Sequence, residues 1–227
     1  MNLQEQTLGR LARDIPGATA LFHRLKLDFC CGGDKSLTEA AARRGLDIES
    51  VVGALEQLNP AIRDEPVPEQ LDDCHLIEYI LTRYHDVHRE QLPEVIRLAQ
   101  RVERVHAGHP ACPAGLSAHL QQMEQDLEGH MAKEEQILFP MITRGMVGMA
   151  VTPVTVMRQD HDDHGEALDR ILAITGDLVL PEGACNTWRA LYTGLQALRN
   201  DLMEHIHLEN NVLFDRIDGK LEGVRHG

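Results

Sequence analysis

The chain has 227 residues, which is enough for one large domain and a small one with a buried core. Its formal net charge of −14 disfavours nucleic acid and anionic membrane surfaces as partners, because both require a basic face. A run of about 18 apolar residues and a signal-peptide layout are both missing, so we expect a cytoplasmic protein, as the five unevenly spaced cysteines also indicate.

The first 59 residues have the pattern of a small helical domain. Short amphipathic segments come first, and the sequence DFCCGGDK then interrupts them. Ser36 and Glu39 form a capping-box pattern, and Asp47 can cap the segment that follows. We therefore expect four short helices at about 7–13, 16–26, 37–45 and 47–58, with Pro16 beginning the second.

Residues 60–70 hold three prolines and several charges, which indicates a linker. From Leu71 onward, apolar residues recur with helical spacing, and no segment alternates at period two. Four long helices joined by short connections form a bundle. The predicted fold is all-α, with an N-terminal helical domain at 1–59 and a four-helix bundle at 71–218, whose helices occupy about 71–105, 116–144, 153–175 and 185–217.

Prolines mark three expected irregularities in the long helices. Pro93 should kink or break the first helix, because it removes a backbone donor. Pro140 should bend the last turn of the second. Thr152 as cap, with Pro153 at the first helical position, should begin the third.

Two similar stretches stand out in the bundle: HMAKEEQILFP at 130–140 and HIHLENNVLFD at 205–215. Each places a histidine and a glutamate four residues apart, so that both side chains lie on one face of a helix. In each stretch this face is also the apolar one. A buried carboxylate without a partner is costly, and a metal ion would satisfy both pairs.

A second motif repeats as well, because HDVHRE at 85–90 recurs as HDDHGE at 161–166. Each half of the bundle therefore reads histidine, then His-x-x-x-Glu on the next helix. His88 and His164 also lie on inward-facing rows, so spacing leaves open which histidine of each motif is the ligand. The candidate ligands of the repeat are His85, His130, Glu134, His161, His205 and Glu209.

Four imidazoles and two carboxylates suit two metal ions, with the carboxylates bridging ions roughly 3.5–4 Å apart. The absence of thiolate favours iron or manganese over structural zinc, and we favour two irons, bridged by an oxo or hydroxo group as well. A ferritin-like site would instead show Glu-x-x-His. Asp126 and Asp160 are candidates for carboxylates that orient the ligand imidazoles, with plain surface acids as the favoured alternative. Glu135 is expected to face elsewhere, since adjacent helical positions diverge by about 100°.

The adjacent pair Cys30 and Cys31 is a second candidate site. Neighbouring cysteines cannot readily chelate one ion tetrahedrally or form an unstrained disulfide. The glycines that follow leave the thiols accessible at a helix end. We expect thiols that accept iron, nitrosyl or an electron from a partner, with a packing role for one of them as the alternative.

These motifs resemble the hemerythrin-like domain, in which a histidine and His-x-x-x-Glu-Glu-x-x-Leu-Phe-Pro recur across a four-helix bundle. Together with DFCCGG at 28–33, the chain resembles the iron-sulfur cluster repair di-iron proteins, the RIC (YtfE/ScdA) family. The second repeat departs from the pattern at Asp215, where the first carries Pro140. The resemblance implies His85 and His161 as ligands, in place of His88 and His164.

The resemblance also implies a function. Such a protein repairs iron-sulfur clusters damaged by nitric oxide or oxidative stress, by iron donation, by nitric oxide reduction at the di-iron site, or by both. Its partners are damaged iron-sulfur proteins and nitric oxide or oxygen, the electron donor being unknown, and a homodimer is compatible with the sequence. The alternative is a hemerythrin-like oxygen or nitric oxide carrier or sensor without turnover.

Overall fold

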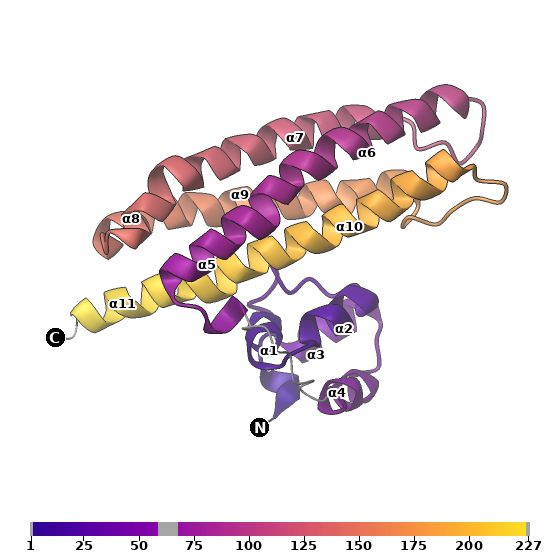
Figure 1. Cartoon of the computed structure of the whole chain (residues 1–227). Helices are drawn as coiled ribbons and strands as arrows, with labels where there is room; N and C mark the ends of the chain where they lie inside the picture. The colour runs from indigo at the N-terminus through magenta and orange to yellow at the C-terminus, as the bar shows by residue number, and fades with distance from the viewer. Residues whose placement is uncertain (1, 59–67, 226–227) are drawn as a thin grey trace.

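The structure, a computed structural model, describes residues 2–58 and 68–225, with side chains up to residue 220. Four long helical rods lie side by side, and a compact group of short helices packs under one side of them (Figure 1). Within the described residues there is no strand, only an isolated bridge between Thr7 and Ser36. The all-α fold is therefore confirmed. Most of the linker predicted at 60–70 lies outside the described residues, and its last three form the 3-10 turn η2 (Pro68–Gln70).

The N-terminal group begins with η1 (Leu3–Glu5) and holds four α-helices, with the caps predicted at Ser36 and Asp47 and a further one at Thr7. Thr7 accepts from the backbone of Arg10, and the Ser36–Glu39 capping box is formed. Pro16, however, does not begin the second helix. Gly17 is its cap, at a φ of 90° that glycine adopts without steric cost. The helices are α1 (Leu8–Asp14), α2 (Ala18–Leu25), α3 (Leu37–Arg44) and α4 (Ile48–Glu56).

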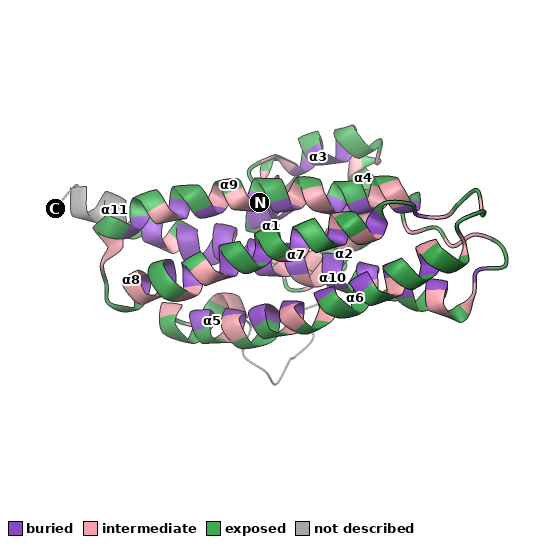
Figure 2. Cartoon of the chain, turned by 90° about the horizontal axis from the view of Figure 1, so that it is seen from above, coloured by how far each residue is buried: buried purple, intermediate pink, exposed green. Residues whose placement is uncertain are grey.

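The bundle is built so that α10 packs on α6, and α7 lies between α6 and α9. Buried residues line the inner faces of these helices, and exposed ones the outer faces (Figure 2). Its segments are α5 (Asp73–Ile80), η3 (Leu81–His85), α6 (Asp86–Val105), α7 (Leu116–Lys133), η4 (Glu134–Leu138), α8 (Phe139–Thr143), α9 (Val147–Thr175), α10 (Asn186–Leu208), η5 (Glu209–Phe214) and α11 (Asp215–Arg225).

Two of the proline predictions need correction. Helix α6 continues through Pro93 without a break. Helix α9 begins at Val147, so Thr152 is not its cap and Pro153 lies inside it. The additional turn is held by packing, because the side chain of Ala150 is fully buried in the same apolar cluster as Met157.

The segments η3, η4 and η5 are π turns, which helical periodicity in the sequence does not reveal. Pro140 follows η4 almost directly, so the irregularity expected there takes the form of a π turn. Each π turn begins or ends on a candidate ligand: His85, Glu134 or Glu209. A π turn shifts the hydrogen-bond register of a helix and is frequent at functional sites.

The N-terminal group docks onto the bundle through close backbone contacts at η5. The side-chain amide of Asn211 donates to the carbonyl of Phe29 at 3.2 Å, and Arg13 donates to the carbonyl of Asn211 at 3.3 Å. A Cβ at Gly9 would approach Asn211 Oδ1 to 2.4 Å, so a larger residue there would displace the Asn211 side chain that holds the two parts together. None of the described helices has the length and apolar composition needed to cross a membrane.

Candidate metal centre

The six candidate ligands converge at the middle of the bundle, although six separate segments contribute them. Each side chain is at most 1% exposed. Their burial follows from the apolar residues on the same helical faces, among them Met123 and Leu127 on α7 and Leu198 and Leu202 on α10. The six are His85 at the end of η3, His130 in α7, Glu134 at the start of η4, His161 in α9, His205 in α10 and Glu209 at the start of η5.

The side chains form two groups that share both glutamates. One group is His85, His205 and the two carboxylates, and the other is His130, His161 and the same two carboxylates. In each group the ligand atoms all lie within 4.8 Å of one another. This arrangement could hold two ions, each with two imidazoles, and Glu134 and Glu209 would face both.

The individual distances support the sharing. Glu134 Oε2 lies 3.4 Å from Nε2 of His85 and 3.3 Å from Nε2 of His130. The two oxygens of Glu209 divide, with Oε1 lying 3.0 Å from His205 Nε2 and Oε2 lying 3.0 Å from His161 Nε2. Glu134 therefore contacts both groups through a single oxygen, whereas Glu209 contacts one group with Oε1 and the other with Oε2.

The donor set fits metal ions better than it fits a hydrogen-bonded cluster. Within each group the two imidazole Nε2 atoms lie 3.2 Å apart. When two nitrogens bind the same ion at about 2.1 Å each, with about a right angle between the two bonds, the nitrogens are about 3.0 Å apart. Both oxygens of Glu134 are buried and have no hydrogen-bond partner among the described residues. A buried carboxylate without a partner is costly, and a cation would compensate it.

Burial and neighbouring charges move the pKa values of the two glutamates in opposite directions. Burial, together with the charge of Glu209, raises the pKa of Glu134 well above its usual range. Burial also acts to raise the pKa of Glu209, but His205 and His161 outweigh it and lower that pKa. Burial lowers the pKa of His205 to about 4, so its imidazole is neutral at pH 7, as a metal ligand must be.

Three of the histidines are oriented through their second ring nitrogen. Nδ1 of His85 lies 2.8 Å from Glu135 Oε1, and Nδ1 of His161 lies 2.8 Å from Asn210 Oδ1. Nδ1 of His130 lies 3.3 Å from Asp160 Oδ2, where the sequence placed a carboxylate. A proton on Nδ1 that is donated to these oxygens leaves Nε2 as a free acceptor that faces the centre.

The structure separates the surrounding acids, and one expectation about them, that for Glu135, was wrong. Asp126 is exposed and accepts a hydrogen bond from Gln122 at 2.9 Å, so it contacts no candidate ligand. Glu135 does not face elsewhere, because it lies in a π turn, where adjacent side chains diverge less than in an α-helix. The repeat held the missed signal: Glu135 and Asn210 each follow a shared glutamate, and each contacts the histidine of the preceding motif.

His88 and His164 are buried beside the centre but belong to neither group of ligands. The ring of His88 lies 5.3 Å from that of His205, and the ring of His164 lies 5.0 Å from that of His130. Burial lowers the pKa of both to about 3, so both are neutral at pH 7. The geometry thus favours His85 and His161, and their role as ligands stays a prediction.

This distinction predicts unequal effects of two substitutions in one motif. His85→Ala should reduce bound metal by about tenfold or more, because it removes one of two imidazoles from a group. His88→Ala should leave most of the metal bound. Metal analysis of both variants after desalting tests this, and equal losses would show that the wrong face of the helix was assigned.

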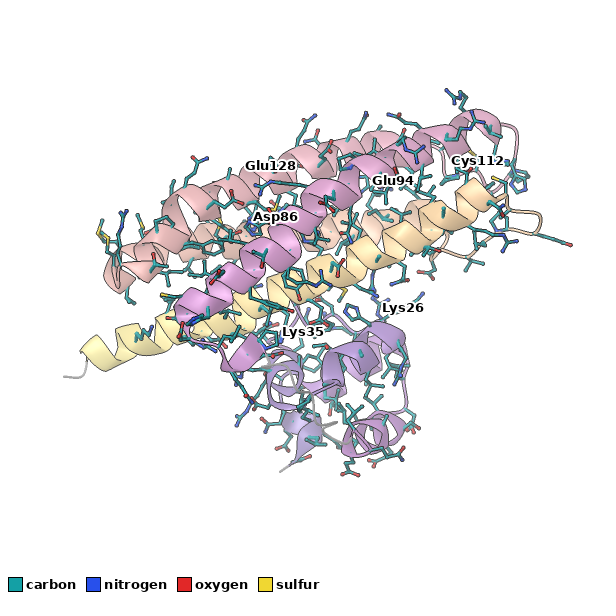
Figure 3. All side chains as sticks on the ribbon, viewed as in Figure 1. Lys26, Lys35, Asp86, Glu94, Cys112 and Glu128 are labelled. Carbon is teal, nitrogen blue, oxygen red and sulfur yellow. The ribbon has the colours of Figure 1, made fainter. Side chains whose placement is uncertain are left out.

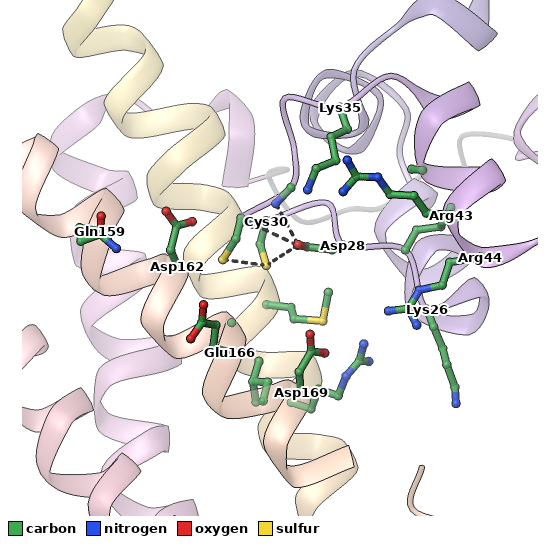
Figure 4. A pocket seen from close by; sticks show the side chains of 18 residues that line it. Lys26, Asp28, Cys30, Lys35, Arg43, Arg44, Gln159, Asp162, Glu166 and Asp169 are labelled. Carbon is green, nitrogen blue, oxygen red and sulfur yellow. Dashed lines mark hydrogen bonds between the residues drawn. The ribbon is translucent and has the colours of Figure 1, made fainter. Parts of the chain in front are cut away.

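The thiols of Cys30 and Cys31 lie where the N-terminal group meets α9 (Figure 4). Their sulfurs are 3.7 Å apart and unbonded, and both lie near Asp28. The Cys31 thiol donates to the carbonyl oxygen of His161 at 3.0 Å. The amide of Asn210 contacts the carbonyl of Cys30 at 3.4 Å, while its oxygen contacts the ring of His161. The loop that carries Cys30 and Cys31 therefore contacts a candidate ligand, His161, directly through Cys31 and indirectly through Asn210.

Comparison with known proteins covers both parts of the chain. Residues 76–217 match the Hemerythrin HHE cation binding domain, and residues 4–59 match ScdA_N, described as a domain of unknown function. Proteins named iron-sulfur cluster repair protein YtfE from Dickeya chrysanthemi, Yersinia pseudotuberculosis and Yersinia pestis are each 50% identical to the chain over 216 residues. Each alignment covers 95% of this chain and 98% of the relative.

Proposed function

The chain belongs to the family of the iron-sulfur cluster repair proteins YtfE, and from this premise we propose that it repairs iron-sulfur clusters damaged by nitric oxide or oxidative stress. The observation that carries the proposal is the pair of buried His/Glu groups that share Glu134 and Glu209. Such a site suits two ions held close together. The hemerythrin match makes iron the metal that we propose.

The side chains of the centre would hold two irons through two imidazoles each and through both carboxylates. Two ferrous ions bound there would supply one electron each, which is enough to reduce two nitric oxide molecules to nitrous oxide with two protons. The protein shields the centre from water. The six ligands are at most 1% exposed, and the rings of Phe139 and Phe214 pack against His85 and His161. Alternatively, the iron is cargo that the site releases to a damaged cluster.

We assign Cys30 and Cys31 to the transfer of iron, nitrosyl or electrons between the centre and a client protein. The contact of Cys31 with the backbone of His161 supports this role. In Cys30→Ala/Cys31→Ala, bundle iron should remain, because the thiols belong to neither His/Glu group, while the repair of a nitrosylated cluster enzyme should fall severalfold. Cys74→Ala, which removes an exposed thiol, is the matched control. Loss of bundle iron in the double variant would contradict the division of roles.

A carrier or sensor without turnover is the second candidate function, because an enclosed centre alone would also suit reversible binding of a diatomic gas. Anaerobic addition of nitric oxide to the reduced, iron-loaded protein separates the two. We expect nitrous oxide in the headspace, or iron delivered to an apo-cluster acceptor, and we expect neither with Glu134→Ala. Recovery of unchanged nitric oxide with all iron still bound would instead identify a binding module.

A further inference from the structure

A cleft of about 630 Å³ lies between the N-terminal group and the bundle, and the two thiols form part of its wall. Its two sides carry opposite charge. Lys35 and Arg43 reach in from the N-terminal group, while Asp162 and Glu166 on α9 stand across from them, with the cysteines between (Figure 4). Figure 3 places Lys26 and Lys35 along the side of the N-terminal group that faces the bundle. Such a gathering of cations is unexpected in a chain with a net charge of −14.

Arg199 on α10 is the most informative residue of this cleft. It lines the cleft and is only 8% exposed, yet it makes no hydrogen bond or ion pair with any described residue. Asp169 and Asp28 lie near enough to attract its charge, but a buried guanidinium without a hydrogen bond or ion pair is costly, and its complement is an anion that binds in the cleft. Arg43 and Arg44 line the same cleft and likewise form no ion pair with the residues that the structure describes.

Three features of the cleft wall indicate which kind of ligand would fit it. The arginines require a carboxylate or a similar anion, the acidic face of α9 requires a cationic group, and the thiols offer a partner for sulfur. A phosphate satisfies only the first. A zwitterionic peptide thiol satisfies all three, and the volume is sufficient for one. We propose that the cleft binds a low-molecular-weight peptide thiol of the glutathione class, which arrives as its disulfide and forms a mixed disulfide with Cys31.

The exchange consumes one disulfide and forms another, so it needs no further oxidant or reductant. Cys31 loses its thiol proton to solvent, and its sulfur bonds to one sulfur of the peptide disulfide as the original S–S bond breaks. The other peptide leaves as a thiolate and takes up a proton. Cys31 is the attacking residue, because Cys30 is only 4% exposed. Cys30 cannot readily displace the peptide, since a disulfide between adjacent cysteines is strained, and the adduct therefore persists.

The inference goes beyond the repair function and does not depend on the metal. The test measures the rate at which the full-length, reduced protein forms an adduct with glutathione disulfide and, separately, with the uncharged 2-hydroxyethyl disulfide. Intact mass and peptide mapping assign the modified cysteine, and exposed Cys74 is the internal reference. The variants are Arg199→Gln and Arg43→Ala/Arg44→Ala. The charge-matched control is Arg101→Ala/Arg104→Ala, which removes two exposed arginines that do not line the cleft.

We expect Cys31 to react with glutathione disulfide faster than Cys74 does, and either cleft variant to slow this reaction about tenfold. The reaction with 2-hydroxyethyl disulfide should change little, and the control variant should behave as the native protein. An equal loss with both disulfides would overturn the proposal, because the arginines would then act on the thiol alone. So would an unchanged rate in both cleft variants, or full competition by inorganic phosphate at an equal concentration. Repair activity is not a readout here, so failure leaves the repair proposal untouched.

Discussion

Glu134→Ala is expected to reduce bound iron from about two ions per chain to a small fraction of that amount. Glu134 belongs to both groups, so its loss removes a ligand from both ions at once and half of the carboxylate charge of the centre. The imidazoles that remain around the cavity carry no negative charge, so they cannot replace the carboxylate that balanced the charge of the ions. Iron should be measured by elemental analysis on protein loaded anaerobically and then desalted.

Glu128→Ala in α7, less than two turns before Glu134, provides the matched comparison, because it removes a half-exposed carboxylate that pairs with Arg89. It should retain iron at the native level. If Glu134→Ala also held two irons, the shared role of this carboxylate would be wrong, and His85 would have to bind its ion without it. Glu209→Ala should behave like Glu134→Ala, since both carboxylates face both groups.

Phe214→Ala should lower the free energy of unfolding by about 3–5 kcal/mol, the usual cost of emptying a buried aromatic site. The Phe214 side chain is fully buried, and its ring stacks on His161 with centroids 5.9 Å apart and planes inclined by 8°. Denaturant unfolding should be followed with a chelator present, so that lost metal does not contribute to the difference.

Val179→Ala is the control for this stability measurement, because Val179 is 70% exposed and should change the free energy by no more than about 0.5 kcal/mol. A cost below about 1 kcal/mol for Phe214→Ala would mean that the pocket collapses around the smaller side chain. The ring of His161 would then be held by Asn210 rather than by aromatic packing.

Much of this structure could be predicted because its signals are local. The capping residues Ser36 and Asp47 each formed the expected bond. The helical spacing of His130 and Glu134 placed both side chains on one buried face, and the internal repeat paired them with their counterparts. The caps and the spacing of histidine and glutamate depend on three to seven neighbouring residues, so tertiary contacts need not be known to predict them.

The remainder depended on contacts between segments. Spacing alone could not separate His85 from His88, because both are buried, and only the packed structure shows that His85 reaches the shared carboxylates while His88 belongs to neither group. Helix α9 begins at Val147 rather than at the predicted Pro153, because the earlier turn buries Ala150 in the core. Glu135 reaches His85 against expectation for the same reason, because the π turn sets the direction of its side chain.

The segments α10, η5 and α11 follow one another without a gap along one side of the bundle (Figure 1). This rod carries Arg199 in the thiol cleft, Glu209 at the centre and Asn211 against the N-terminal group, and Arg216 donates to the carbonyl of Leu71 at the start of the bundle. Its backbone amides cannot open locally without disturbing several of these contacts. In hydrogen exchange, the stretch from Arg199 to Asn211 should therefore open as one cooperative unit, and metal loading should slow exchange along its whole length.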